Sequence, residues 1–350
     1  MLPVKQDPLE SGGPEVRREK ISPATPQVSV IIPTYRHSQY VVRTIKSVLE
    51  QAFSDYEIIV VNDGSPDQTR KVLEPFVENR TIRYYEQPNR GQAAARNEGV
   101  RHAKGEFIAF LDDDDFWPPD KLLWQVRFLE HHPEVGIVGG TYLAVDEADL
   151  PVEPGDFHPS ITFESLFARN PFLSPGQTLM RSALLADIGG LNPAIWGADD
   201  WDLWFRALKH SAVVMVDQLA LYYRVHHANS SNQSARLLKA CCDTIEIHLR
   251  DVPKAQRAKL RGISYSTIYR GFGSRVVNEA KAVMRKGRVI KSLGALRSLR
   301  PLSRGIYRNG PLCRILAWEL LLKPMRTVFY PKQRTVVQNR AMAEHDMSNE

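Results

Sequence analysis

The stretch VSVIIPTYRHSQYVVRTIKSVLEQAFSDYEIIVVNDGS, residues 28–65, decides the fold. Two short apolar runs, VSVII (28–32) and YEIIVV (56–61), flank a segment at 39–52 whose apolar residues recur three and four apart. The runs predict buried strands, and the spacing between them predicts an amphipathic helix. A strand, a helix and a second strand in this order form the repeating unit of an α/β fold with a parallel sheet.

The same alternation continues along the first two thirds of the chain. Further strands are expected at 81–85, 106–111, 135–140, 177–180, 213–216 and 219–225. Further helices are expected at 67–78, 91–103, 119–131 and about 199–209. Residues 141–172 lose the period and carry repeated prolines, which predicts a loop-rich excursion. Strands that are apolar on both faces and separated by helices imply a mainly parallel sheet with helices on both faces.

Charge and composition divide the chain of 350 residues further. Residues 1–27 are rich in proline and polar side chains, which predicts a flexible leader. Residues 1–234 carry 22 Lys and Arg against 32 Asp and Glu, whereas residues 235–350 carry 24 against 8. We therefore expect a leader at 1–27, an α/β unit at 28–234, and a basic, mostly helical region at 235–350.

Several classes of protein are disfavoured. The apolar stretch ILAWELLL, which ends at Leu322, contains Glu319 and is far shorter than the roughly 20 residues of a spanning helix. The first 20 residues lack the apolar run of a secretory signal. Cys241, Cys242 and Cys313 lack the spacing of a disulfide framework or zinc site, so we expect reduced, structural cysteines in a cytoplasmic protein. Dinucleotide, P-loop and nucleophile-elbow motifs do not occur at strand ends, and the basic region has no nucleic-acid reading motif.

Polar residues follow three of the predicted strands where each strand ends. They are Pro33-Thr34-Tyr35, Asn62-Asp63-Gly64-Ser65 and Asp112-Asp113-Asp114-Asp115. The carboxyl ends of parallel strands share one edge of a sheet, where open α/β sheets bind ligands. Four consecutive aspartates repel one another, and carboxylates are ligands that Mg²⁺ or Mn²⁺ prefers. This predicts a divalent cation site, the alternative being a solvated acidic loop that caps a helix.

Four further features have both a functional and a structural interpretation. Asp63 is placed to contact a base or ribose, or to organise its turn through backbone hydrogen bonds. Gly91 opens the helix in NRGQAAARNEG (89–99), where backbone approaches a ligand or small residues pack on the sheet. The carboxylates at the start of GADDWDLWFR supply a general base or a helix N-cap. His226 ends the last strand as a ligand of metal or phosphate, or as a structural histidine.

With these residues identified, the sequence resembles the family 2 glycosyltransferases, inverting enzymes with the GT-A nucleotide-diphospho-sugar fold. The resemblance covers roughly residues 28–231. Six segments carry it, in the family's order and approximate spacing: VSVIIPTYRH, EIIVVNDGSPD, NRGQAAARNEG, EFIAFLDDDDFWPPDKL, GADDWDLWFR and YRVHHANSS.

The resemblance implies roles for individual residues. On the nucleotide side it implies Pro33, Thr34 and Tyr35 along the base, Asp63 at uracil or ribose, the Gly91 helix start, Arg96 near a phosphate, and Asp112 or Asp113 facing ribose and metal. At the metal it implies Asp114, together with Asp112 and with His226, which resembles a histidine near the diphosphate. It implies Asp200 as the catalytic base, with Asp199 and Trp201 on the acceptor side. Asp199 replaces the family's usual glutamate, and the doubled His226-His227 leaves the choice of histidine open.

The function implied is transfer of a sugar from a nucleotide-diphospho-sugar, with UDP as the expected nucleotide, to a hydroxyl group. The implied cofactor is Mn²⁺ or Mg²⁺, and the implied acceptor is a saccharide or a lipid-linked saccharide in cell-surface polysaccharide or glycolipid synthesis. A sugar-nucleotide-binding or scaffold protein that lost catalysis is the alternative. The basic region 235–350 is expected either to lie on an anionic membrane surface, making the protein peripheral on the cytoplasmic face, or to pack its apolar faces on the α/β unit.

Overall fold

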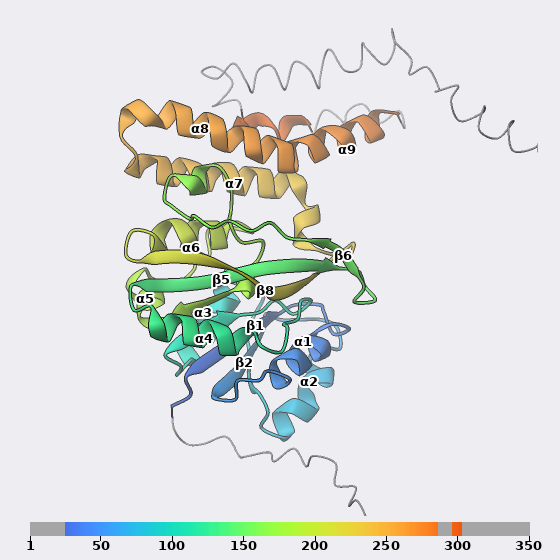
Figure 1. The fold of residues 1–350 in the computed structure, drawn as a ribbon. Helices are drawn as coiled ribbons and strands as arrows, with labels where there is room; N and C mark the ends of the chain where they lie inside the picture. Colours follow the sequence, from blue (N-terminus) through green and yellow to red (C-terminus); the bar gives the residue numbers. More distant parts are fainter. Residues whose placement is uncertain (1–24, 286–295, 303–350) are drawn as a thin grey trace, which may run out of the picture.

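The structure is a computed structural model that describes residues 25–285 and 296–302. The described residues leave out most of the predicted leader and much of the basic region 235–350. Cys313 also lies outside them. The described part is a sheet with helices on both faces and further helices stacked on one of them (Figure 1).

Eight strands form one sheet. They are β1 (Val28–Thr34), β2 (Tyr56–Asn62), β3 (Arg83–Glu86), β4 (Phe107–Phe110), β5 (Val135–Val145), β6 (Pro151–Pro154), β7 (Thr178–Arg181) and β8 (Ala212–Arg224). The order is β3-β2-β1-β4-β7-β5-β6, with β8 paired to β5. Pairing is parallel among β1 to β4 and between β5 and β8, and antiparallel on both sides of β7 and between β5 and β6. The expected mainly parallel α/β sheet is therefore confirmed, with β7 and β6 reversed.

The helices follow the predicted spacing closely. They are α1 (Val41–Leu49), α2 (Thr69–Glu78), α3 (Gln92–His102), α4 (Lys121–His131), α5 (Ser182–Asp187), α6 (Asp199–Ala207), α7 (Ser234–His248), α8 (Lys254–Ile268) and α9 (Ser274–Arg285). Short turns of 3-10 helix lie at η1 (Ser165–Phe167), η2 (Pro175–Gln177), η3 (Ser230–Asn232), η4 (Leu249–Asp251) and η6 (Arg300–Leu302), and a π-helical turn at η5 (Tyr269–Gly273) joins α8 to α9.

Alternate side chains of β1 fill two separate hydrophobic clusters. Ile31 points into the cluster that contains residues of α3, α6, α7 and α8. Val30 and Ile32 point to the opposite face, into the cluster built with α1, α2 and α4. Because successive strand residues face opposite sides of a sheet, the continuous apolar run VSVII is what a strand covered on both faces requires.

Two expectations about the second half of the sheet are corrected. The segments 213–216 and 219–225 form one strand, β8, which pairs along β5 through shifts in register between Gly139 and Tyr142. The excursion at 141–172 is partly regular, because β5 continues to Val145 and returns as β6. All four residues of β6 are exposed, which explains a hairpin that lacks an apolar period. Tyr142 packs over Gly155, where a Cβ would overlap its ring.

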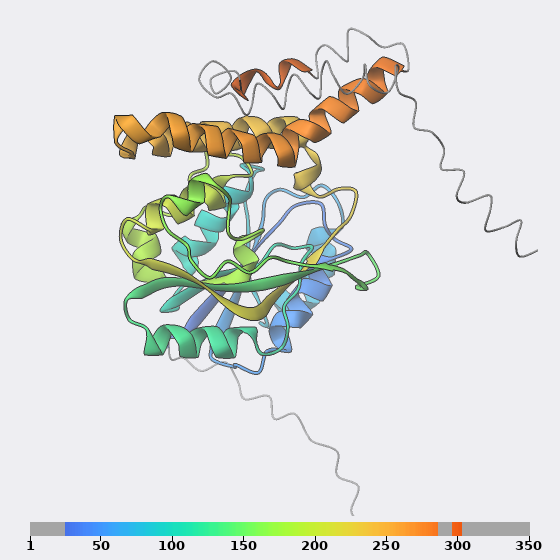
Figure 2. The ribbon, with the colours of Figure 1, turned by 45° about the horizontal axis from the view of Figure 1, so that its top comes forward.

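The helices after residue 234 pack on the α/β unit. Leu238, Cys242 and Ile245 of α7 are buried in the same cluster as Trp204 and Phe205 of α6. In Figure 1 and Figure 2 the orange helices α8 and α9 lie beyond α7 on this face. The hydrophobic core thus continues across residue 234, and the domain division itself stays a prediction. Within residues 25–285 and 296–302, the helices are too short or too polar for any of them to cross a bilayer.

Candidate functional site

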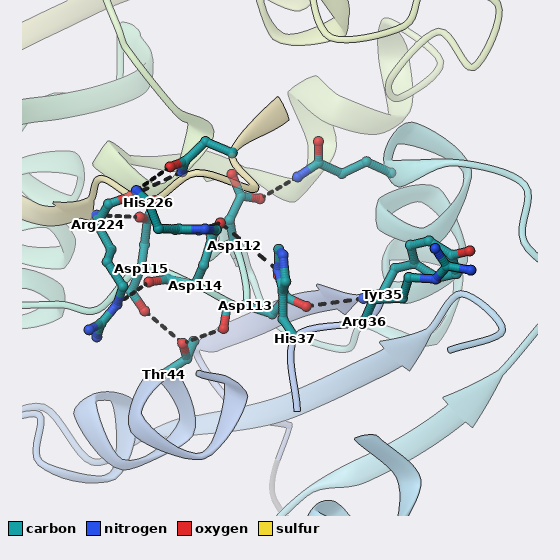
Figure 3. Close-up of polar contacts among 12 residues, drawn as sticks. Tyr35, Arg36, His37, Thr44, Asp112, Asp113, Asp114, Asp115, Arg224 and His226 are labelled. Atoms are coloured by element: carbon teal, nitrogen blue, oxygen red, sulfur yellow. Dashed lines mark hydrogen bonds and ion pairs between the residues drawn. The ribbon is translucent and has the colours of Figure 1, made fainter. Parts of the chain in front are cut away.

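The carboxyl ends of β1, β2 and β4 meet at one edge of the sheet. Thr34 pairs with Asn62 at the last position of the β1–β2 ladder, and β4 pairs with β1 on the other side. The acidic run 112–115 follows β4 directly, and Figure 3 shows its side chains beside those that follow β1 and β8. The predicted meeting of these polar segments is therefore present.

Asp113 joins the loop after β1 to the acidic run. Its Oδ1 lies 2.7 Å from Nδ1 of His37, and its Oδ2 accepts a hydrogen bond from the backbone N–H of Tyr35 at 3.0 Å. Burial raises the pKa of Asp113, and the contact with His37 opposes that rise. Burial alone would lower the pKa of His37, but the hydrogen bond and charge of Asp113 outweigh it and raise that pKa to about 9. Between these contacts Arg36 has a left-handed φ of 64°.

Asp114 lies between two histidines. Its Oδ2 is 3.0 Å from Nε2 of His226 and 3.9 Å from Nδ1 of His37. The side chain of His226 is 1 % exposed and that of His227 is 91 % exposed, so the structure places His226 beside the acidic run. The three groups each offer one ligand atom within 4.8 Å of the others. One carboxylate and two imidazoles are a donor set that fits a divalent cation.

Asp112 faces a different set of partners. Its Oδ1 accepts hydrogen bonds from Gln92 Nε2 at 2.8 Å and from Arg96, and its Oδ2 accepts from Ser174 Oγ at 3.1 Å. The prediction that Asp112 shares the metal with Asp114 stays a prediction. Among the described residues, the cluster of candidate ligand atoms is formed by His37, Asp114 and His226.

Arg96 links the acidic run to helix α6. Its side chain is buried, with the residue 2 % exposed, and its Nη1 donates to Asp199 Oδ2 at 3.1 Å while its Nη2 pairs with Asp112. Although burial lowers the pKa of Arg96, the two carboxylates raise it further, so the guanidinium keeps its charge. Arg96 thus bridges two carboxylates, and its contact with a phosphate stays a prediction.

Asp200 lies in the first turn of α6 and is 8 % exposed. Its Oδ2 accepts a hydrogen bond from Asn170 Nδ2 at 3.0 Å, and its Oδ1 accepts from the backbone N–H of Trp201 at 2.7 Å. Burial, and then the neighbouring charge of Asp199, raise the pKa of Asp200 to about 7. The N-cap alternative is wrong for this carboxylate, because Ala198 is the N-cap residue.

The side chains of Asp199 and Trp201 are buried. The pKa of Asp199 is raised by burial, while Arg96 acts in the opposite direction. The indole of Trp201 is buried in the core, and its Nε1 donates to the carbonyl of Leu166 at 3.1 Å. The Trp201 ring thus packs toward η1, and the acceptor-side position of Asp199 and Trp201 stays a prediction.

The nucleotide-side residues form a second layer around the strand ends. Asp63 is buried, and it accepts hydrogen bonds from Gln87 Nε2 at 2.7 Å and from the backbone N–H groups of Arg90 and Gly91 at 2.9 and 2.8 Å. This is the turn-organising alternative, and contact with a nucleotide stays a prediction. Gly91 has a φ of 90° at the start of α3, a conformation that favours glycine.

The end of β1 presents residues of unequal exposure. Pro33 and Thr34 are buried. Tyr35 is exposed at the rim, with the guanidinium of Arg36 5.1 Å from its ring centre. An exposed aromatic ring at a strand end is a surface that a bound ligand would cover.

Sequence reasoning missed two functional candidates. His37 belongs to the segment PTYRH that was already singled out, and a histidine just past a strand end was the available signal. Arg224 is buried at the end of β8, where its Nε donates to the Asp114 carbonyl at 3.0 Å and its backbone N–H donates to Asp115 Oδ1 at 3.0 Å. The local sequence around Arg224 does not predict these contacts, because they join residues 109 and 110 apart in the chain.

Comparison with known proteins gives consistent findings. The sequence profile of glycosyl transferase family 2 matches residues 29–189. TuaG of Bacillus subtilis, a candidate teichuronic acid biosynthesis glycosyltransferase, is 32 % identical over 214 residues, which cover 59 % of this chain and 83 % of TuaG.

Two solved structures share the fold. Staphylococcus aureus TarS 1–349 in complex with UDP-GlcNAc matches with a TM-score of 0.54 and 20 % identity, covering 79 % of this chain and 81 % of that one. The mannosyltransferase PcManGT of Pyrobaculum calidifontis in complex with GDP-Man and Mn²⁺ matches with a TM-score of 0.53 and 18 % identity, covering 82 % and 88 %.

Proposed function

The chain belongs to glycosyltransferase family 2 and is a transferase enzyme, and we propose that it is a metal-dependent, inverting glycosyltransferase. In this proposal it moves a sugar from a nucleotide-diphospho-sugar to the hydroxyl group of an acceptor. UDP is the expected nucleotide. The acceptor is a saccharide or a lipid-linked saccharide.

One observation carries the proposal: a single buried guanidinium joins the acidic run to the start of α6. Arg96 pairs with Asp112, two residues before Asp114, and with Asp199, the residue before Asp200. Arg96 thus connects the segment of Asp114, the carboxylate proposed to bind the cation, with the segment of Asp200, the carboxylate whose pKa is raised. Transfer of a glycosyl group needs these two chemistries in one site, because one face of the sugar loses a diphosphate while the other is attacked.

The residues that would hold the cation are Asp114 and His226, on the donor side of the site. A bound divalent cation supplies charge neutralisation to a leaving diphosphate. The chain's own contribution is to fix these ligands. The Arg224 side chain donates a hydrogen bond to the backbone carbonyl of Asp114. The backbone N–H of His226 donates to Asn229 Oδ1, which fixes the chain just after β8.

Asp200 is the expected general base. A base works best when its pKa lies near the operating pH, and burial raises the pKa of Asp200 to about 7. In the ionised form this carboxylate accepts the proton of the acceptor hydroxyl while that oxygen forms a bond to the anomeric carbon. The bond from that carbon to the diphosphate oxygen breaks on the opposite face, and its electron pair leaves with the nucleotide. One displacement inverts the anomeric centre, and the base contributes about 10² to 10⁴-fold to the rate.

The nucleotide is expected against Tyr35 and Asp63, with Pro33 and Thr34 behind. The exposed Tyr35 ring supports this position. TarS holds UDP-GlcNAc and PcManGT holds GDP-Man, so related folds accept different bases. The choice of UDP for this chain therefore needs a direct comparison of nucleotides.

The cellular setting is proposed from the resemblance and from charge. Synthesis of a cell-surface polysaccharide or glycolipid is the expected context, and the name of TuaG points in the same direction. The 24 Lys and Arg in residues 235–350 support attachment to an anionic leaflet. Because α7 and α8 bury their apolar faces in the core, such attachment would rest on charge, so sedimentation of the full chain with phosphatidylglycerol vesicles should weaken as salt rises and be absent with phosphatidylcholine.

The proposal is tested by calorimetric titration of the full chain with UDP, GDP and dTDP, each with and without Mn²⁺. We expect one nucleotide to bind in a metal-dependent way. Asp114→Ala should abolish the metal dependence, and Asp200→Asn should keep binding but lose transfer. Asp120→Asn, a change of an exposed carboxylate, is the matched control. Binding of a nucleotide without transfer by the unaltered chain to any acceptor would favour the scaffold alternative, and binding of no nucleotide would refute the proposal.

A further inference from the structure

His37 belongs to the candidate cation site because of where it lies in the fold and because imidazole binds metal ions. It follows β1, whereas Asp114 follows β4 and His226 follows β8, so three strand ends each contribute one group. The rings of His37 and His226 lie 5.5 Å apart at 84°, and the ring of Tyr40 packs against both, at 5.9 and 4.9 Å between ring centres. Figure 3 shows the two imidazoles on either side of the acidic run.

The separations suit a shared cation. Ligand atoms about 2.1 Å from one ion lie about 3 Å apart when adjacent and about 4 Å apart when opposite. Asp114 Oδ2 lies 3.0 Å from Nε2 of His226 and 3.9 Å from Nδ1 of His37, and each of the three groups has a ligand atom within 4.8 Å of the others. Nδ1 of His37 also lies 2.7 Å from Asp113 Oδ1, so it binds an ion only after it releases that contact. A small turn of the His37 side chain would then bring the three groups onto one ion.

The remaining aspartates of the run have other partners. Asp112 accepts from Arg96 and Ser174, and Asp113 accepts from the Tyr35 N–H. Asp115 accepts from the Arg224 N–H through Oδ1, while its Oδ2 is buried without a hydrogen-bond partner among the described residues. The run of four carboxylates thus supplies one of them, Asp114, to the histidine cluster. The candidate cation site therefore contains one carboxylate and two imidazoles, fewer carboxylates than a run of four aspartates indicates.

We propose that His37 is a third protein ligand of the cation, and that the resulting set of two imidazoles and one carboxylate selects a transition-metal ion such as Mn²⁺ over Mg²⁺. This inference rests on the proposed function, because it assumes that the site takes a cation. Imidazole favours first-row transition metals, whereas Mg²⁺ prefers oxygen ligands and keeps its water.

The test measures metal binding without turnover. Full-length protein is titrated with Mn²⁺, with and without UDP, while free Mn²⁺ is followed by electron paramagnetic resonance, and Mg²⁺ affinity is obtained by competition. Electron spin echo modulation then counts the imidazole nitrogens bound to Mn²⁺. The variant His37→Asn keeps an N–H donor for Asp113 but removes the imidazole, and His37→Gln is a second variant. His227→Asn is the matched control, since that side chain is exposed.

We expect two coordinated imidazoles in the unaltered chain and in the control, and one in His37→Asn. The Mn²⁺ affinity of His37→Asn should fall at least about tenfold, while that for Mg²⁺ changes by less than about threefold. Two imidazoles retained in both His37 variants would overturn the inference, as would equal losses for the two ions, which a purely structural role would produce. In either case Mn²⁺ binding by the unaltered chain would leave the proposed function standing, whereas no Mn²⁺ binding at all would refute its metal dependence.

Discussion

The substitution Asp200→Asn should change how the stability of the protein depends on pH. Burial raises the pKa of this carboxyl from its ordinary 3.8 to about 7 in the folded chain. The folded state therefore holds the proton more tightly than the unfolded state does. Between those two pKa values the folded chain binds one more proton at this group, so the free energy of unfolding decreases as pH rises, and the decrease ends above about pH 7.

The magnitude follows from the two pKa values. Each pKa unit corresponds to about 1.4 kcal/mol, so an ionised Asp200 lowers the free energy of unfolding by about 4 kcal/mol above pH 7. Between about pH 5 and about pH 8 the change is about 3 kcal/mol, because part of the transition lies below that interval. Asparagine cannot ionise, and the Asn170 amide and the Trp201 N–H can still meet its side chain after one amide turns over.

The assay is urea unfolding followed by tryptophan fluorescence at about pH 5 and about pH 8. Other carboxyls in the site also titrate, so the quantity of interest is the variant minus the unaltered protein at each pH. This difference should increase by about 3 kcal/mol from the lower to the higher pH. Asp120→Asn should show no such increase. A difference that stays constant for Asp200→Asn would mean that the carboxyl is ionised throughout, and the reasoning from its burial would be refuted.

Three further predictions follow from the same contacts. The logarithm of kcat/KM should fall by about one unit per pH unit below about pH 7, because the base Asp200 must be ionised; a profile flat down to about pH 5, measured with saturating metal, would contradict this. Arg96→Met should lower the free energy of unfolding by about 3 to 5 kcal/mol in urea titrations, because it leaves two buried carboxylates unpaired, and Arg96→Lys should cost less. Gly64→Ala should lower the free energy of unfolding by about 1 to 2 kcal/mol in the same assay, because the φ of Gly64 is 73° and a Cβ would lie 3.0 Å from the Asn89 backbone nitrogen. An unchanged urea midpoint would contradict this and show that the loop adjusts.

The sequence determined the architecture and the edge where chemistry occurs. Runs such as VSVII and EFIAFL are apolar on both faces, which only a sheet covered on both sides satisfies. Most strands and helices appear where the periods predict them, whereas β6 and α5 were not predicted. Parallel strands then bring their carboxyl ends to one edge, so the meeting of Tyr35 and Asp113 needed no knowledge of side-chain positions. The direction of β7 was not predictable, because a four-residue strand reads the same in either direction.

The partners of each site residue were decided by tertiary structure alone. The roles of Arg96 at a phosphate, Asp112 at a metal and Trp201 at an acceptor stay predictions. The sequence did not indicate that Arg96 pairs with Asp112 and Asp199, or that the Trp201 indole donates to the Leu166 carbonyl. The contact of His226 with Asp114 joins residues 112 apart, and that of Arg96 with Asp199 joins residues 103 apart. Local patterns record which face of a strand or helix a side chain occupies, whereas a pair this distant depends on strand order and loop paths, so only the folded chain specifies it.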